Sequence, residues 1–385
     1  MTTSYPVAAL PHTGENYRSP LLKKQMPGLD VLRGIAVLSV LFYHGLYWFV
    51  PPDLPAGAFA HRVMNLFVFG WLGVNLFFVL SGFLITGILL DSKHKPGYAR
   101  SFYTRRMRRI LPAYLLILTV LKIHPGISWK YVALSLMFLA NFPVAGIGLG
   151  YGVLWSLAVE EQFYLIWPWA VRWLSSAALF WMSVGSIVLS PLLRYGSWSG
   201  LLPLGSGAMT WLISDSLAIG AVVALFLRSR WGTPQNARRV AFGMLAFGSV
   251  LLAAGAPFGI LHRANGLGAA LQNTTFEFLF AAMLLMALFV GDIPWFFRWT
   301  AWLRFFGYIS YGLYLYHVWG FGFYDEITHL LGLYRGTYTS AGVFVRFGIT
   351  SVLLVLVSWL SRRYFEDRFL RHKEKTTLAM PAQVL

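Results

Sequence analysis

Residues 28–44 read GLDVLRGIAVLSVLFYH, a stretch that is long and apolar enough to cross a lipid bilayer as a helix. The stretch contains two basic side chains, Arg33 and His44. Their separation is close to three helical turns, so both project from one helix face, roughly 16 Å apart along the axis. An ionisable group inside a membrane span is costly and indicates a functional site by default. The stretch therefore predicts a membrane helix that carries functional groups at two depths.

The composition of the whole chain extends this prediction. Of the 385 residues, 57% are hydrophobic and 12% are charged, and the charged fraction is about half that of an average soluble domain. Apolar runs of spanning length fall at 29–49, 66–90, 110–123, 154–173, 177–193, 208–228, 239–258, 272–291, 304–323 and 340–361. We therefore expect an all-α fold, a polytopic integral membrane bundle of about ten transmembrane helices.

The distribution of basic residues predicts how the chain crosses the membrane. The loops at 91–109 and 228–239 and the tail after residue 361 are strongly basic, as cytoplasmic segments are. The run at 129–143 is too short to cross comfortably, and a re-entrant or interfacial helix there keeps all the basic segments in the cytoplasm. The predicted domains are a cytoplasmic N-terminal tail (1–28), a membrane domain (29–371) and a cytoplasmic C-terminal tail (372–385).

Charge and cysteine content exclude several kinds of site. The net charge of +17 would suggest a nucleic-acid partner in a soluble protein, but these basic residues lie in loops between apolar runs, where membrane topology explains them. We therefore expect no nucleic-acid partner. The chain has no cysteine, which excludes disulfides, thiol nucleophiles and cysteine-ligated metals. We also expect no metal site.

Arg33 and His44 allow two interpretations. In the structural one, Arg33 lies at the membrane interface and pairs with Asp30, while His44 hydrogen-bonds a neighbouring helix. In the functional one, a neutral His44 takes a proton from a hydroxyl group near neutral pH, and Arg33 holds an anionic ligand. The residues alone leave both open.

Two adjacent carboxylates, Glu160 and Glu161, lie in the run WSLAVEEQFY. They are costly inside a span-length segment, and on a helix they point about 100° apart. We expect Glu160 to be the buried member, because it shares a helix face with Tyr164. A structural salt bridge from Glu160 to Arg33 or Arg172 is the alternative.

The segment 102–112 reads FYTRRMRRILP. A cytoplasmic position is enough to explain its arginines. Several guanidinium groups at a helix start can also grip pyrophosphate and a ribose phosphate. We therefore expect Arg105, Arg106 and Arg109 to form a phosphate cradle, with topology as the alternative.

Other polar side chains on the spans could line a tunnel. Ser81 lies in FFVLSGF, where small and polar residues usually serve close helix packing. Tyr311 and His317 lie in SYGLYLYH, whose tyrosines are first of all bulky fillers. His317 is either a second imidazole beside His44 or a structural hydrogen-bond partner. Ser81, Tyr164 and His317 are equal candidates for donors to a tetrahedral oxyanion.

Five of these motifs occur together in a fixed order. They are Arg33-x10-His44, Phe77-Phe78-Val79-Leu80-Ser81-Gly82-Phe83, Arg105-Arg106-x2-Arg109-Ile110-x-Pro112, Trp155-Ser156-x3-Glu160-Glu161-Gln162-Phe163-Tyr164 and Ser310-Tyr311-x5-His317. The set resembles the acyltransferase-3 family of bacterial multi-pass membrane O-acyltransferases. The resemblance runs from about residue 27 to residue 371.

The resemblance implies a function and a location. It implies transfer of an acyl group from acyl-CoA, acetyl-CoA in the commonest case, on the cytoplasmic side of the bacterial inner membrane. The acceptor would be a hydroxyl of a sugar-containing or lipid-linked molecule on the outer side. The motif positions that it maps onto this chain are Arg33, His44, Glu160, Arg105, Arg106 and Arg109.

This chain differs from the family pattern at its C-terminal end. Many members end the last span with Glu-x-Pro-Phe, whereas this chain reads Glu366-Asp367-Arg368-Phe369. The resemblance therefore assigns no role to Glu366. Some members also carry a periplasmic esterase-like domain. This chain ends soon after its last span, so we expect the membrane domain to carry out the whole acyl transfer.

These residues suggest a mechanism. The CoA nucleotide would dock at the arginines, with Arg33 at the inner end of the mouth and Ser81 beside the donor. His44 would remove the proton of the acceptor hydroxyl, and Glu160 would orient the imidazole. Prior acylation of His44 is the alternative route. We expect Tyr164, Tyr311 and His317 on the acceptor side.

A proton-coupled transporter, or a flippase-like protein for lipid-linked sugars, is the main alternative class. Such a protein would use the same intramembrane groups. The sequence has no clear pair of inverted repeats, which many transporters show. Release of free CoA thiol from acyl-CoA and an acceptor would distinguish the enzyme from both.

Overall fold

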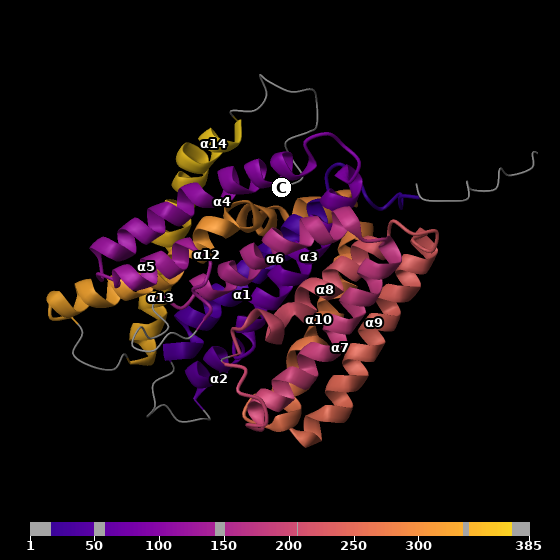
Figure 1. Cartoon of the computed structure of the whole chain (residues 1–385). Helices are drawn as coiled ribbons and strands as arrows, with labels where there is room; N and C mark the ends of the chain where they lie inside the picture. The colour runs from indigo at the N-terminus through magenta and orange to yellow at the C-terminus, as the bar shows by residue number, and fades with distance from the viewer. Residues whose placement is uncertain (1–16, 50–57, 143–150, 206, 334–338, 372–385) are drawn as a thin grey trace, which may run out of the picture.

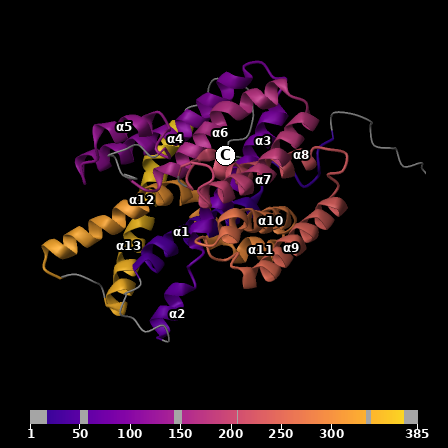
Figure 2. The ribbon, with the colours of Figure 1, turned by 60° about the horizontal axis from the view of Figure 1, so that its bottom comes forward.

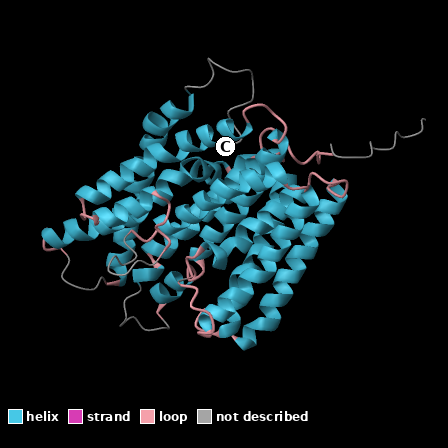
Figure 3. Cartoon of the chain, in the orientation of Figure 1, coloured by secondary structure: helices cyan, strands magenta, loops and turns pink. Residues whose placement is uncertain are grey.

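The computed structural model describes residues 17–49, 58–142, 151–205, 207–333 and 339–371. Within these residues every regular element is a helix and there is no strand, as Figure 3 shows. The predicted all-α class is confirmed. Most of the predicted N-terminal tail and the whole of the predicted C-terminal tail lie outside the described residues.

Each apolar run predicted from the sequence falls on a helix. In the described part of the chain these helices are α1 (Pro27–Gly45), α3 (Gly73–Ser92), α4 (Tyr98–Ile123), α6 (Leu154–Trp173), α7 (Ser176–Trp198), α8 (Thr210–Phe226), α9 (Pro234–Gly255), α10 (Gly266–Val290), α12 (Ala301–Leu330) and α13 (Ser340–Leu360). The shorter α-helices there are α2 (Phe59–Asn65), α5 (Trp129–Leu136), α11 (Pro294–Trp299) and α14 (Asp367–Arg371).

Six helical segments among the described residues are long and apolar enough to cross a membrane. They contain α1, α3, α7, α9, α10 and α13, and α8 is a shorter apolar helix. Helices α4 and α6 carry the arginines and glutamates of the predicted site, which makes them less apolar. The chain thus has the helices of a multi-pass membrane protein, and the count of about ten crossings stays a prediction.

Helices α1 and α3 lie in the middle of the bundle (Figures 1 and 2). In both views α4, α5, α12 and α13 lie on one side of them, and α8, α9 and α10 lie on the other. Helix α1 packs extensively on α12, and α3 packs extensively on α8. The motif-bearing helices therefore surround the centre of the molecule.

Glycine allows α3 and α8 to approach closely. A Cβ atom added to Gly82 would lie 2.0 Å from the carbonyl oxygen of Leu217, and one added to Gly220 would lie 2.1 Å from that of Val79. Any larger side chain at these positions would push the helices apart. The packing interpretation of Gly82 is therefore confirmed, and small residues serve here as they commonly do between membrane helices.

The two ends of the described chain lie at the same end of the bundle (Figure 1). The backbone N–H of Ser19 donates to the carbonyl of Leu227 at 2.9 Å, just after α8. Arg18 pairs with Asp91 at the end of α3. Helix α14 packs on α4, which begins a few residues after α3. This arrangement agrees with an even number of crossings.

The short run at 129–143 begins as the eight-residue helix α5. The hydroxyl of Ser128 caps it by accepting a hydrogen bond of 3.1 Å from the backbone N–H of Tyr131. On its inner side, the hydroxyl of Tyr114 on α4 donates to the carbonyl of Ser135 at 2.7 Å. A short helix is therefore present as expected, and whether it is re-entrant stays a prediction. Pro143 lies outside the described residues.

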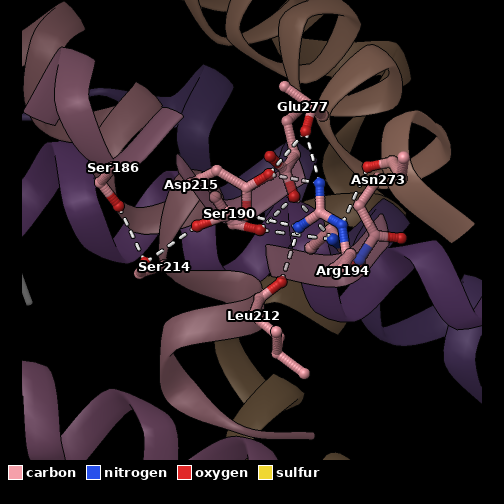
Figure 4. A network of polar contacts seen from close by, with 12 residues as sticks. Ser186, Ser190, Arg194, Leu212, Ser214, Asp215, Asn273 and Glu277 are labelled. Atoms are coloured by element: carbon pink, nitrogen blue, oxygen red, sulfur yellow. Dashed lines mark hydrogen bonds and ion pairs between the residues drawn. The ribbon is translucent and has the colours of Figure 1, made fainter. Parts of the chain in front are cut away.

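A buried polar network joins α3, α7, α8 and α10 (Figure 4). Arg194 and Asp215, which are 8% and 0% exposed, form a two-pronged ion pair with N–O distances of 3.1 and 2.8 Å. Thr274 hydrogen-bonds both partners at 2.6 Å. Glu277, also fully buried, accepts from Asn75 at 2.8 Å and from Ser216. No motif in the sequence predicts this network, because its members lie far apart along the chain.

Candidate functional site

A cavity of about 120 Å³ lies between α1, α3, α4, α6 and α12. Its lining contains most of the site residues expected from the sequence. Those residues are Arg33, Ser81, Arg106, Arg109, Glu160, Tyr164 and Tyr311. Five helices thus bring their motifs to one space.

Arginines form one wall of the cavity. Arg33 on α1 donates to Asp30 at 2.8 Å, so the pairing expected from the structural interpretation is present. The same side chain also lines the cavity. Arg109 lies within electrostatic range of Arg33, Arg106 and Arg362. This concentration of positive charge would attract a phosphate-bearing ligand.

Arg106 has unused hydrogen-bonding capacity. Its guanidinium carbon lies 3.7 Å from the ring centroid of Tyr164. Its Nε atom and the Tyr164 hydroxyl are both buried, and within the described chain neither has a hydrogen-bond partner. Buried polar atoms are nearly always satisfied. An anionic ligand in the cavity would supply what these two atoms lack.

Arg105 does not line the cavity. Its guanidinium donates to the Ser101 hydroxyl at 2.5 Å instead. On the helix Arg105 points about 100° away from Arg106, and Arg109 points between the two, so the cavity faces the Arg106 side of α4. Of the three arginines expected to form a phosphate cradle, Arg106 and Arg109 line the cavity and Arg105 does not. Arg33 is the third arginine in the lining.

Glu160 contacts Ser81. The Ser81 hydroxyl donates to the Glu160 carboxylate at 2.6 Å, and Arg106 and Arg109 lie within electrostatic range of that carboxylate. We expected Glu160 to orient His44, but among the described residues the hydrogen-bond partners of His44 are others. The rotation of α6 turns Glu160 towards α3 and the arginines. Glu160 thus belongs to the arginine end of the cavity.

His44 and His317 form a pair. The Nε2 atom of His317 lies 3.2 Å from Nδ1 of His44, and the two rings are 5.0 Å apart between centroids. Nδ1 of His44 also lies 3.0 Å from the carbonyl oxygen of Val40. Nδ1 of His317 lies 2.7 Å from the carbonyl oxygen of Tyr314. His317 thus lies beside His44 and hydrogen-bonds it, so both expected interpretations of His317 stay open.

The backbone carbonyls assign the tautomers of this pair. A carbonyl only accepts, so His317 carries its hydrogen on Nδ1, and its Nε2 is a lone-pair acceptor when the ring is neutral. Nδ1 of His44 must then carry a hydrogen, which it directs at both Val40 and His317. The remaining lone pair of a neutral His44 is on Nε2. That atom is the one able to accept a proton.

Tyr314 separates the histidine pair from the cavity. Neither His44 nor His317 lines the cavity, whereas Tyr314 and Ser156 do. The hydroxyls of Tyr314 and Ser156 share a hydrogen bond of 2.5 Å, and the Tyr314 ring lies 5.7 Å from the His317 ring between centroids. The cavity thus ends at Tyr314, and the expected tunnel does not reach His44.

The sequence contained a signal for Tyr314. Tyr311, Tyr314 and His317 are three residues apart, so they lie along one face of α12. Tyr311 was the expected site residue, and it lines the cavity while its hydroxyl donates to the carbonyl of Ile110 at 2.8 Å. Glu366, to which the resemblance assigned no role, is buried and lies within electrostatic range of Arg109.

Comparisons with known proteins identify the family of this chain. The acyltransferase domain that defines the acyltransferase-3 family matches residues 26–363. Peptidoglycan O-acetyltransferase OatA of Listeria monocytogenes is 32% identical over 169 residues, which are 38% of this chain and 24% of OatA. YrhL of Bacillus subtilis, named provisionally as a peptidoglycan O-acetyltransferase, is 32% identical over 214 residues, which are 48% of this chain and 28% of YrhL.

The chain thus spans about a quarter of the length of these curated relatives. No solved structure matches it at a significant level.

Proposed function

The chain belongs to the acyltransferase-3 family, whose domain occupies residues 26–363, and from that membership we propose that it is an O-acyltransferase that works across a membrane. The donor is acyl-CoA, with acetyl-CoA as the first candidate, bound from the cytoplasm. The acceptor is a hydroxyl of a sugar-containing molecule on the outer side. The names of its relatives favour a cell-wall glycan such as peptidoglycan.

The observation that carries this proposal is the position of the cavity. It extends from the arginines to Tyr314, which contacts the histidine pair. The cationic end suits the phosphates of the donor, and the histidine end suits proton removal from a hydroxyl. Transfer from a phosphate-bearing thioester to an alcohol requires groups that bind the phosphates and, beyond them, a base. The arginines and the histidine pair follow this order.

The proposed orientation follows the basic segments. The donor end faces the cytoplasm of a bacterial inner membrane, and both termini lie there. Ten helices cross, and α5 is the re-entrant or interfacial element. The outer ends of α1 and α12 then hold the histidine pair near the acceptor side.

In the proposed reaction Nε2 of His44 accepts the hydroxyl proton of the acceptor. The acceptor oxygen forms a bond to the thioester carbonyl carbon, and the bond from that carbon to sulfur breaks. The CoA thiolate leaves and takes up the proton from His44. His317 and Val40 accept from Nδ1 throughout and stabilise the imidazolium, the part that a carboxylate plays in other acyl transferases.

Acylation of His44 before transfer is the second route. Incubation with labelled acyl-CoA alone distinguishes the two, because only this route leaves label on His44. Tyr314 must turn aside in either route, since it lies between the cavity and the histidines.

We expect Arg106→Gln to weaken donor binding. Loss of a charged hydrogen-bond donor should raise the KM for acyl-CoA about tenfold or more. The measurement is the rate of CoA-thiol release as a function of acyl-CoA concentration, with a sugar acceptor present.

Arg105→Gln is the matched control. It removes an equal charge from the same helix but outside the cavity, so its KM should change less than about twofold. Equal effects of the two substitutions would mean that the arginines serve topology alone. A wild-type protein that releases no CoA thiol would contradict the proposed function.

A further inference from the structure

The aromatic rings of Tyr43 and Trp48 lie close to His44. The 3₁₀ turn Tyr47–Phe49 follows α1 and carries Trp48, which is 61% exposed. The Trp48 ring lies 4.8 Å from the His44 ring between centroids and is nearly perpendicular to it. Tyr43 lies 5.1 Å from His44 and 5.8 Å from Trp48. The exposed indole of Trp48 thus lies against His44, the candidate base.

A cation lies next to this cluster. Arg263, in the loop between α9 and α10, stacks on Trp71 with its guanidinium carbon 3.3 Å from the ring centroid. Its Nη2 atom donates to Asn273 at 3.1 Å. It also lies within electrostatic range of Tyr43. Arg263 therefore lies in the neighbourhood of Tyr43, whose ring lies near His44.

Close packing fixes this proximity. The 3₁₀ turn Gly70–Leu72, which carries Trp71, lies directly on α1. A Cβ atom added to Gly70 would lie 2.3 Å from the carbonyl oxygen of Ser39 and 2.8 Å from Cβ of Tyr43. The platform under Arg263 thus cannot move away from α1 without breaking that packing.

Arg263 has donors to spare. A guanidinium group has five N–H donors, and the structure gives Arg263 one hydrogen bond. Among the described residues it has no carboxylate partner. Stacking on an indole leaves the edge of the guanidinium free, which is the geometry that binds phosphate or carboxylate. The loop is otherwise poor in charge, so Arg263 marks a place for an anion.

We propose that Trp48, Tyr43, Trp71 and Arg263 form the acceptor subsite, and that the acceptor is a sugar that carries an anionic group. The sugar ring packs on the exposed face of Trp48, beside His44. Its phosphate or carboxylate binds Arg263. This inference rests on the proposed function, because it assigns the acceptor of that same reaction.

Binding without the donor tests the subsite directly. Calorimetry on the full chain in detergent would compare glucose 1-phosphate, glucuronic acid and methyl glucoside. We expect the two anionic sugars to bind about tenfold more tightly than the neutral one, as one charge-assisted hydrogen bond allows. The anionic sugar that binds more tightly shows whether the natural acceptor carries a phosphate or a carboxylate.

Two variants and a control complete the test. Arg263→Gln should remove the preference for the anionic sugars and leave methyl glucoside unchanged. Trp48→Ala should weaken the binding of all three sugars. Arg62→Gln on α2, an exposed arginine outside the subsite, should change none. The subsite is overturned if Arg263→Gln weakens neutral and anionic sugars equally, or if it leaves the preference intact.

A turnover assay separates this result from the proposed function. If wild type releases CoA thiol while Arg263→Gln keeps the preference for anionic sugars, only the subsite is wrong. If the anionic sugars bind through Arg263 and no CoA thiol is ever released, the subsite holds and the acyltransferase proposal is wrong.

Discussion

His44→Ala should abolish acyl transfer while the protein still folds. General-base catalysis by a positioned histidine contributes about 10²- to 10⁴-fold, so kcat should fall at least about a hundredfold. The fold should persist because, among the described residues, the hydrogen bonds of His44 reach only Val40 and His317. The measurement is CoA-thiol release at saturating acyl-CoA, together with the thermal unfolding midpoint in detergent.

His317 provides the matched comparison. His317→Phe removes the acceptor for Nδ1 of His44, so it should lower kcat less than His44→Ala does and leave the KM for acyl-CoA unchanged. His317→Gln keeps a side-chain acceptor and should recover part of the rate. Full turnover in His44→Ala would end its assignment as the base. Equal rates in the two His317 variants would assign His317 a packing role.

Arg194→Met should cause the largest loss of stability. It leaves the buried carboxylate of Asp215 without its cation (Figure 4). Breaking a buried ion pair from one side costs about 3–5 kcal/mol of free energy of unfolding. The measurement is the unfolding midpoint and the yield of monodisperse protein.

The double variant Arg194→Met with Asp215→Leu is the control for this prediction. An apolar pair of similar volume avoids the uncompensated charge, so it should be more stable than Arg194→Met alone. A single variant as stable as wild type would show that the network does not hold α7, α8 and α10 together.

The fold was predictable because apolar runs mark helices directly. The boundaries were less accurate where helices continue beyond the apolar part. Helix α4 begins at Tyr98 although its apolar run begins near residue 110, because the arginines extend the same helix. Helix α3 begins at Gly73, several residues inside its run, since the segment before it forms tight turns.

The membership of the site was predictable to a large extent, but its pairings were not. Motifs indicate that Arg33, Ser81, Arg106 and Glu160 belong together, and the cavity contains them. They do not fix how each helix is rotated, so Glu160 was expected at His44 and contacts Ser81 instead. The ion pair of Arg194 and Asp215 depends on packing between helices, so the spacing of residues in the sequence does not predict it.

Sealed proteoliposomes would test the central claim, which is transfer of the acyl group through the protein from one side of the membrane to the other. Labelled acyl-CoA is supplied only on the side of the basic segments, and the sugar acceptor only on the opposite side. The account predicts labelled acceptor on its own side, with free CoA thiol remaining on the donor side. Labelling that occurs only when donor and acceptor share one side would contradict it.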